Sequence, residues 1–237
     1  MKFYTITTLL VLFVVMSCQT KKQATSKEAL PNEEHNTTEA HRNKADEQMH
    51  RTSVAKLIKI FESPERDAYQ QPEKVLAYIG DMKGKKILDI GAGSGYFSVK
   101  LAKKGAHVIA GDVDDEFLKY LKERIQKEQL DTLIEVRKLP YDSPDLRNEE
   151  VDKVLIVNTY HHIEDRPTYF AKVLQGLKKD GELIVIDFYK RKLPIGPPPP
   201  HKIAKEIVLK ELKQAGFTNL EINTDVLKMQ FIIRAKR

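Results

Sequence analysis

Three glycines and one acid have the types and the spacing that could do chemistry. Gly91, Gly93 and Gly95 alternate directly after a short apolar run at 87–90, so a ligand can lie against bare backbone there. Helical spacing begins at Phe97, which leaves the unpaired N–H groups of a helix start facing that ligand. Asp112 ends a second apolar run, 21 residues after Gly91, and a carboxylate there can accept hydrogen bonds from ribose hydroxyls. The pattern predicts a site for a nucleoside-containing ligand.

The same glycines distinguish between cofactor families. A dinucleotide fingerprint needs its third glycine at the position of Tyr96, which disfavours a nicotinamide oxidoreductase. The arrangement Asp89-x-Gly91-x-Gly93-x-Gly95 instead resembles the first motif of the class I S-adenosylmethionine-dependent methyltransferases. The resemblance covers roughly residues 56–237 and implies S-adenosylmethionine as the cofactor. It also implies a three-layer αβα Rossmann-like sandwich with a mostly parallel seven-stranded sheet that ends in an antiparallel hairpin.

The resemblance implies a set of residues around the cofactor. Asp89 aids the methionine end through the turn, Asp112 holds the ribose, and Leu139 and Tyr141 are neighbours of the adenine. The full predicted set is Asp89, Gly91, Ala92, Gly93, Gly95, Asp112, Val113, Leu139, Tyr141 and Asn158.

Polar residues follow the apolar run at 151–157 and are expected to border the pocket, because ligands sit beyond the carboxyl ends of parallel strands. Imidazole titrates near neutral pH, so His161 or His162 is the predicted general base. On an extended segment the two would point in opposite directions, and at most one would face the methyl group. The alternative is a structural histidine, and without a third ligand we predict no metal site. Weaker candidates for substrate contact are Tyr160, Asp187 and Tyr189.

A polar connection is expected at 64–72, before the first strand. The resemblance implies that this segment folds over the cofactor, which makes Arg66, Tyr69 and Gln70 candidate lid residues. The alternative is that they cap and solvate two flanking helices. One is expected to carry Val54, Leu57, Ile58 and Phe61 on one face and to end near Ser63-Pro64, and the other to begin after Pro72 with Val75, Leu76 and Ile79.

The rest of the chain alternates between strand and helix patterns, as expected of a parallel sheet with helical crossovers. We expect a helix after Asp114 or Asp115, and a helix that Arg166 opens and Gly181 stops. The proline run at 197–200 is predicted to form a wall of the substrate pocket, with interaction-domain recruitment as the alternative. Further expected elements are strands at 133–136, 151–157 and 183–186, a helix through Ile203, Ile207 and Leu212 that ends at Gly216, and strands at 217–222 and 226–233.

The amino-terminal end differs in kind from the rest. Lys2 and a short apolar segment lead to Cys18, the one cysteine of the chain, which resembles a bacterial lipoprotein signal peptide with a lipidated cysteine. We expect a signal peptide at 1–17, a flexible polar tether at 18–48 and a methyltransferase domain at 49–237. This predicts a membrane-anchored, extracytoplasmic lipoprotein. An uncleaved leader and a cytoplasmic place are the alternatives.

Composition restricts the partners. The net charge of +6 is mild and the charges are interspersed, so a solvated surface is favoured over a nucleic-acid groove. We expect a methyltransferase that acts on a small molecule. The other function that the residues allow is a membrane-tethered module that binds a nucleoside or cofactor without catalysis. The sequence leaves the acceptor and the oligomeric state open.

Overall fold

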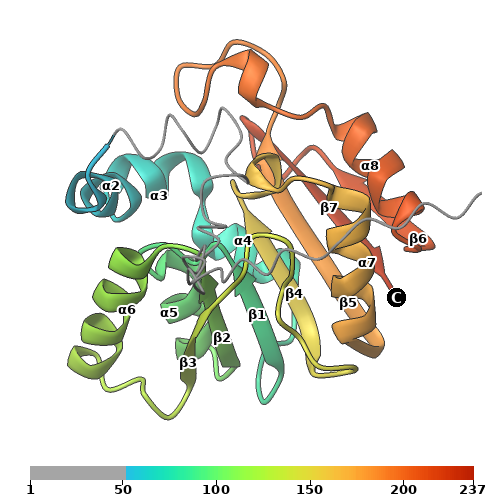
Figure 1. Cartoon of the computed structure of the whole chain (residues 1–237). Helices are drawn as coiled ribbons and strands as arrows, with labels where there is room; N and C mark the ends of the chain where they lie inside the picture. Colours follow the sequence, from blue (N-terminus) through green and yellow to red (C-terminus); the bar gives the residue numbers. More distant parts are fainter. Residues whose placement is uncertain (1–51) are drawn as a thin grey trace, which may run out of the picture. The chain divides into compact units, whose positions relative to one another are not determined.

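A seven-stranded sheet forms the centre of the structure, a computed structural model that describes residues 52–237 (Figure 1). The strand order is β3-β2-β1-β4-β5-β7-β6. Strand β7 alone runs in the direction opposite to all the others. This confirms the predicted fold class and its closing hairpin. The strands are β1 (Lys86–Ile90), β2 (His107–Asp112), β3 (Ile134–Lys138), β4 (Val151–Val157), β5 (Leu177–Phe188), β6 (Asn219–Asn223) and β7 (Gln230–Lys236).

Helices cover both faces of the sheet, which makes three layers (Figure 1). The helices are α2 (Val54–Phe61), α3 (Pro64–Gln70), α4 (Pro72–Ile79), α5 (Tyr96–Lys103), α6 (Asp115–Lys127), α7 (Arg166–Gly176) and α8 (Lys205–Gln214), with short 3-10 helices η1 (Tyr160–His162) and η2 (Pro199–His201). Asp114 caps α6 by accepting backbone N–H bonds from Glu116 and Phe117, as one of the two predicted caps.

Alternating strand residues feed two separate apolar layers. Ile87 and Leu155 face α4, α5 and α6, whereas Leu88 and Val154 face α7 and α8. Because side chains alternate across a strand, a strand covered on both faces must be apolar at almost every position. The continuous runs in β1 and β4 therefore reflect two cores that share one sheet.

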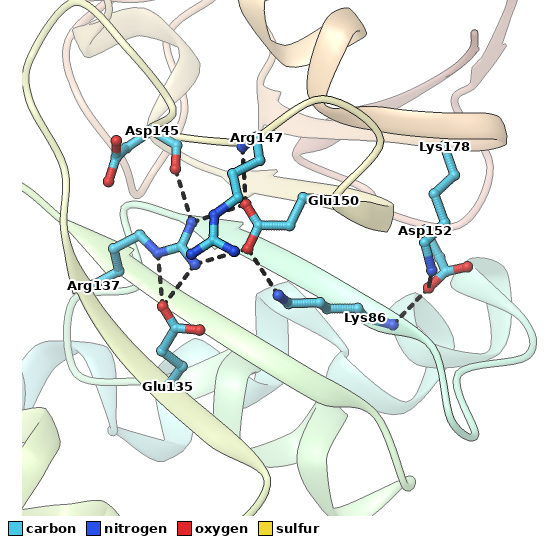
Figure 2. Close-up of polar contacts among 8 residues, drawn as sticks. All are labelled: Lys86, Glu135, Arg137, Asp145, Arg147, Glu150, Asp152 and Lys178. Atoms are coloured by element: carbon cyan, nitrogen blue, oxygen red, sulfur yellow. Dashed lines mark hydrogen bonds and ion pairs between the residues drawn. The ribbon is translucent and has the colours of Figure 1, made fainter.

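An ion-pair network holds the connection between β3 and β4 (Figure 2). Glu150 accepts hydrogen bonds from Arg137 at 2.9 Å and from the Lys86 ammonium at 2.8 Å. Its oxygens also receive the Arg147 backbone N–H at 3.0 Å. Because Lys86 begins β1 and Arg137 belongs to β3, one carboxylate ties the long loop to two strands.

Several predicted boundaries are wrong. The expected polar connection at 64–72 is helix α3, which Pro64 opens and Ser63 caps by accepting the Arg66 N–H. Helix α7 ends at Gly176 and not at Gly181, because Leu177 is extended and already pairs with β4. Ile203 lies outside α8, and the final strands begin and end later than expected: β6 at Asn219–Asn223 and β7 at Gln230–Lys236.

The predicted signal peptide, Cys18, the whole predicted tether at 18–48 and the first three residues of the predicted domain lie outside the described residues, so they stay predictions. Within residues 52–237, no helix has the length and apolar character needed to cross a bilayer.

Candidate functional site

The glycine turn lies where β1 passes into α5. Gly91, Gly93 and Gly95 all have positive φ angles, of 71°, 55° and 81°. A side chain at Gly91 would collide with Thr159, and one at Gly95 with Leu121. Only glycine fits both the backbone angle and the space at these two positions. The turn is therefore packed closely on one side by Thr159, the second residue after β4.

Asp112 closes the turn from the neighbouring strand. It is buried, and its Oδ2 accepts the Gly93 N–H at 2.8 Å while its Oδ1 accepts the Asp114 N–H at 3.0 Å. Burial raises the pKa of the Asp112 carboxyl, and these backbone bonds act in the opposite direction. The acid and the turn predicted from spacing thus belong to one site.

Asp89 belongs to β1, two residues before the turn, and its carboxylate is bonded to α5. Its Oδ2 accepts the hydroxyl hydrogen of Ser98 at 2.6 Å, within the buried start of α5. Burial raises the pKa of Asp89 to about 6, against the stabilising bond from Ser98. Its contribution to a ligand would therefore be indirect, through the shape of the turn.

Helices α2 and α3 are fastened onto the turn. The Phe61 ring lies 3.4 Å from where a side chain on Gly93 would begin. The Ser94 hydroxyl donates to Glu62 at 2.5 Å, and Arg124 donates to the same carboxylate at 2.6 Å. Another bond to α3 comes from the hydroxyl of Tyr96, which donates to Asp67. The segment before β1 therefore covers the turn.

Arg66, one of the predicted lid residues, is half-buried in this cover, with its Nε inaccessible to solvent. Its guanidinium lies 4.0 Å from the centre of the Tyr96 ring, and its Nη1 donates to the Phe61 carbonyl at 3.2 Å. Its Nε has no hydrogen-bond partner among the described residues, and burial lowers the pKa of the guanidinium. The Glu62 and Asp89 carboxylates are near enough to stabilise the cation, but a buried donor without a partner is still costly. This donor suits a ligand carboxylate near the turn.

Three amides join α3 to the carboxyl end of β4. The Gln70 amide donates to Gln230 at 3.0 Å, Gln230 donates to Asn158 at 2.5 Å, and Asn158 donates back to Gln70 at 3.3 Å. Gln70 and Gln230 are fully buried, and Asn158 has a left-handed φ of 57°. Each amide satisfies the next, so the ring holds α3 in place. Asn158 is engaged with this ring.

His161 forms a pair with Asp187 at the ends of β4 and β5. Its Nδ1 lies 2.9 and 3.1 Å from the two carboxylate oxygens, and both side chains are buried. The predicted extended geometry is wrong: Asn158 ends the strand, and both histidines lie in η1 with ring centres 4.3 Å apart. Since an ionised carboxylate only accepts, an Nδ1 that donates to it carries a proton, and in the neutral tautomer Nε2 then keeps a lone pair.

The comparisons with known proteins agree with this geometry. Residues 88–185, from within β1 through most of β5, match the family model described as a methyltransferase domain. Residues 88–185 form a methyltransferase domain. A crystal structure of an S-adenosylmethionine-dependent methyltransferase from Aquifex aeolicus is similar, with a TM-score of 0.70 and 28% identity, and covers 78% of this chain and 98% of its own. The predicted class of domain and its cofactor, S-adenosylmethionine, are confirmed.

Curated relatives resemble the methyltransferase domain at low identity. The ubiquinone biosynthesis O-methyltransferase of Acinetobacter baylyi is 31% identical over 107 residues, which cover 44% of this chain and 43% of that enzyme. The enzyme of the same name from Acinetobacter baumannii is 27% identical over 164 residues, or 60% of this chain and 68% of its own. The chain therefore spans less than half of the former relative.

The remaining predicted residues of the methyltransferase domain lie in different surroundings. Leu139 is buried over Gly111 at the end of β2, and Tyr141 is half-buried beyond it. Tyr160 is fully buried toward α8, where its hydroxyl donates to Glu211 at 2.8 Å. Ala92 is buried in the turn itself, Val113 is half-buried, Tyr69 lies 5.9 Å from Phe188 between ring centres, and Tyr189 lines a separate cavity.

Sequence reasoning missed residues that complete the site from far along the chain. Gln230 comes 72 residues after Asn158, and Glu62 comes 32 residues before Ser94. A glutamine within an apolar strand, as in Gln230-Phe231-Ile232, was the available signal, because a buried amide needs partners. Among residues 52–237, no cluster of three acid, histidine or cysteine side chains could hold a metal.

Proposed function

We propose that this protein transfers a methyl group from S-adenosylmethionine to a small-molecule acceptor. The observation that carries the proposal is the contact between the glycine turn and Asp112, where Gly93 donates to the carboxylate at 2.8 Å. It joins bare backbone and a ribose-binding acid into one site at the carboxyl ends of adjacent parallel strands. The methyltransferase relatives named above support the reaction class.

Residues of this chain would hold the two ends of the cofactor. Asp112 would accept hydrogen bonds from the ribose hydroxyls, and Leu139 and Tyr141 would border the adenine. Arg66 would donate its unused Nε to the carboxylate of the methionine half, which would also give a buried donor its partner. When bound, the cofactor supplies a methyl group on a positively charged sulfur.

His161 is the proposed general base. Asp187 fixes the ring with Nδ1 protonated, so Nε2 can accept the proton that the acceptor atom loses as it is methylated. The ring is buried, which excludes water from this step. His162 lies against His161 and belongs to the same turn. The acceptor would therefore carry an ionisable hydrogen, as a hydroxyl or an amine does.

Calorimetry of the purified full chain with S-adenosylmethionine, S-adenosylhomocysteine and NAD tests this proposal. We expect saturable binding of the first two and none of NAD. A chain that binds neither sulfur compound would contradict the proposal. A chain that binds both, but forms no S-adenosylhomocysteine with any hydroxyl or amine acceptor, would instead be a non-catalytic binding module.

We also propose that Cys18 carries a lipid that anchors the protein on the extracytoplasmic side of a bacterial membrane. The support is the sequence pattern alone. Mass spectrometry of the membrane fraction tests it: the mature chain should begin at a lipid-modified Cys18, and Cys18→Ser should abolish the modification. An unmodified chain that starts at Met1 would contradict the anchor.

A further inference from the structure

A second cavity, of about 510 Å³, lies beyond the end of β5 and is not explained by the cofactor site. Three separate segments form it: the chain after β5, the start of α8 and the turn between β6 and β7. The proline run at 197–200 is not among the lining residues, although the lining segments flank that run. The lining residues are Tyr189, Lys190, Arg191, Ala204, Lys205, Glu206, Thr224 and Lys228.

The lining of this cavity is strongly basic. Four of its eight residues are cations, and its one acid, Glu206, is already paired with the neighbouring Lys205. Another hollow, beside α6 and β3, has three lysines but also two acids, Asp115 and Glu123. A concave surface with one sign of charge concentrates ligands of the opposite sign. The cavity is therefore suited to an anion.

The ring of Tyr189 is the aromatic surface of this cavity. The Arg191 guanidinium lies 5.1 Å from the centre of its ring, and the ring packs against Phe231. Burial raises the pKa of the Tyr189 hydroxyl, Arg191 and Lys205 act to lower it, and Asp225 raises it, so two cations and one acid lie near the ring. Stacking orders Arg191 before any ligand arrives, which lowers the entropy cost of binding.

The start of α8 adds a backbone donor to the same wall. The N-cap Ala204 has no side chain that can cap the helix, and its carbonyl accepts the N–H groups of Ile207 and Val208. This leaves the N–H groups of Lys205 and Glu206 without a backbone acceptor, and the Glu206 carboxylate accepts its own N–H, so the Lys205 N–H is the open donor. Its partial positive charge adds to that of the side chains, in a helix of ten residues.

The cavity is connected to the proposed base by the chain itself. Asp187, which holds His161, is only two residues before Tyr189. Lys202 is fully buried between them: its ammonium donates to the Arg191 carbonyl at 3.0 Å and lies 5.5 Å from the Phe188 ring. The wall that carries Arg191 is thus fixed to the end of β5, which carries Asp187, the partner of the proposed base.

We propose that this cavity binds the oxyanion of a small molecule, a phosphate monoester or a carboxylate, and that this molecule is the methyl acceptor. Its place as acceptor rests on the proposed function, whereas anion binding does not. Arg191 and Lys228 hold the oxyanion above the Tyr189 ring. The part of the molecule that is methylated then lies toward His161.

A titration followed by amide NMR shifts tests the site. The full chain, without cofactor, is titrated with phenyl phosphate at low ionic strength, and we expect saturable shifts of the Lys205 and Glu206 amides. The variant R191S/K228S should bind about tenfold more weakly, and added salt should weaken binding by the native chain. The matched control K119S/K122S removes the same charge from the other hollow and should change the affinity less than about twofold.

Three results would overturn the proposal. They are the absence of saturable shifts at these amides, an equal loss in both double variants, and binding to phosphatidylglycerol vesicles that needs Arg191 and Lys228 while phenyl phosphate fails. The last result would identify a lipid headgroup surface. Calorimetry with S-adenosylmethionine separates this failure from that of the proposed function, because R191S/K228S should keep the native affinity for the cofactor.

Discussion

The carboxylate of Asp112 accepts one hydrogen bond from the Gly93 N–H and one from the Asp114 N–H. It has further lone pairs that can accept hydrogen bonds from a ligand. Asp112→Asn keeps the volume but replaces one acceptor by a donor that faces these N–H groups. We expect S-adenosylmethionine affinity to fall about 10- to 100-fold, since hydrogen bonds to charged groups contribute about 1.5–3 kcal/mol. Calorimetry measures the loss.

Asp131→Asn is the control for that variant, because Asp131 is exposed in the loop after α6. Unchanged affinity in Asp112→Asn would remove this acid from the binding site.

His161→Gln tests the base separately from binding. We expect the rate of methyl transfer to fall about 10²- to 10⁴-fold, the usual contribution of a positioned acid or base, with cofactor affinity unchanged. Asp187→Asn should lower the rate as well, because it no longer fixes the protonated Nδ1. Rates come from S-adenosylhomocysteine formation with a saturating acceptor, and His107→Gln, an exposed histidine at the start of β2, is the control. If His161→Gln and Asp187→Asn transfer methyl groups as fast as His107→Gln, His161 is not the general base.

At single residues, prediction succeeded where the chemistry is local in sequence. The glycines and Asp112 could be found because a turn and the end of a strand have their own spacing. Arg66 could be named but not its unpaired Nε, since burial depends on Tyr96 and Phe61 packing around it. Gln230 was missed, because nothing near it in sequence shows that its partners are Gln70 and Asn158.

Among the elements, α3 depends on one such long-range contact. Gln230→Ala would leave the buried amides of Gln70 and Asn158 with unmet hydrogen bonds, at a cost of about 1–3 kcal/mol in the free energy of unfolding. Because the ring joins α3 to the sheet, we also expect Gln230→Ala to speed up hydrogen exchange, relative to the native chain, more in residues 64–70 than in β1. Denaturant unfolding and exchange mass spectrometry measure the two effects.

Gln126→Ala, on the exposed face of α6, is the matched control and should change neither quantity. Uniform protection across α3 and β1 in Gln230→Ala would show that the amide ring does not hold the helix.

Element boundaries failed where a local signal competed with pairing. Gly181 looked like a helix stop, but Leu177 pairs with Val151 and ends α7 five residues earlier. The segment 64–70 has few apolar residues and was predicted to be a connection, whereas Pro64 and Ser63 start a helix there. Caps and proline describe the starts of helices well, while their ends depend on the strand that follows.

For the whole molecule, the sheet was predictable because its two apolar cores require apolar residues at nearly every position of the central strands. Apolar runs without alternation in β1 and β4 require cover on both faces, which only crossover helices supply. The resemblance then gave the number of strands and the closing hairpin. What the sequence did not show is how the long loop between β3 and β4 is held, since its ion pairs join residues from three elements (Figure 2).

Glu150 in that network makes the stability of the whole domain depend on pH. Hydrogen bonds from Arg137 are the main reason that the pKa of Glu150 falls from its ordinary 4.5 to about 2, and Lys86 contributes. A lowered pKa stabilises the folded state fully above pH 4.5, and this stabilisation is lost as the pH falls from there to about 2. Its size follows from the shift and is at most about 3 kcal/mol.

Glu150→Gln should therefore lower the free energy of unfolding by about 2–3 kcal/mol at pH 7, and its deficit relative to the native chain should shrink toward zero near pH 2. Other acids titrate in both proteins, so their effects cancel in this difference. Urea unfolding at a series of pH values measures it, and Glu149→Gln, which alters an exposed pair with Arg237, should show a small deficit. A deficit for Glu150→Gln that does not change with pH would mean that the residue acts through packing, and the ion pairs would not be what holds the loop to the sheet.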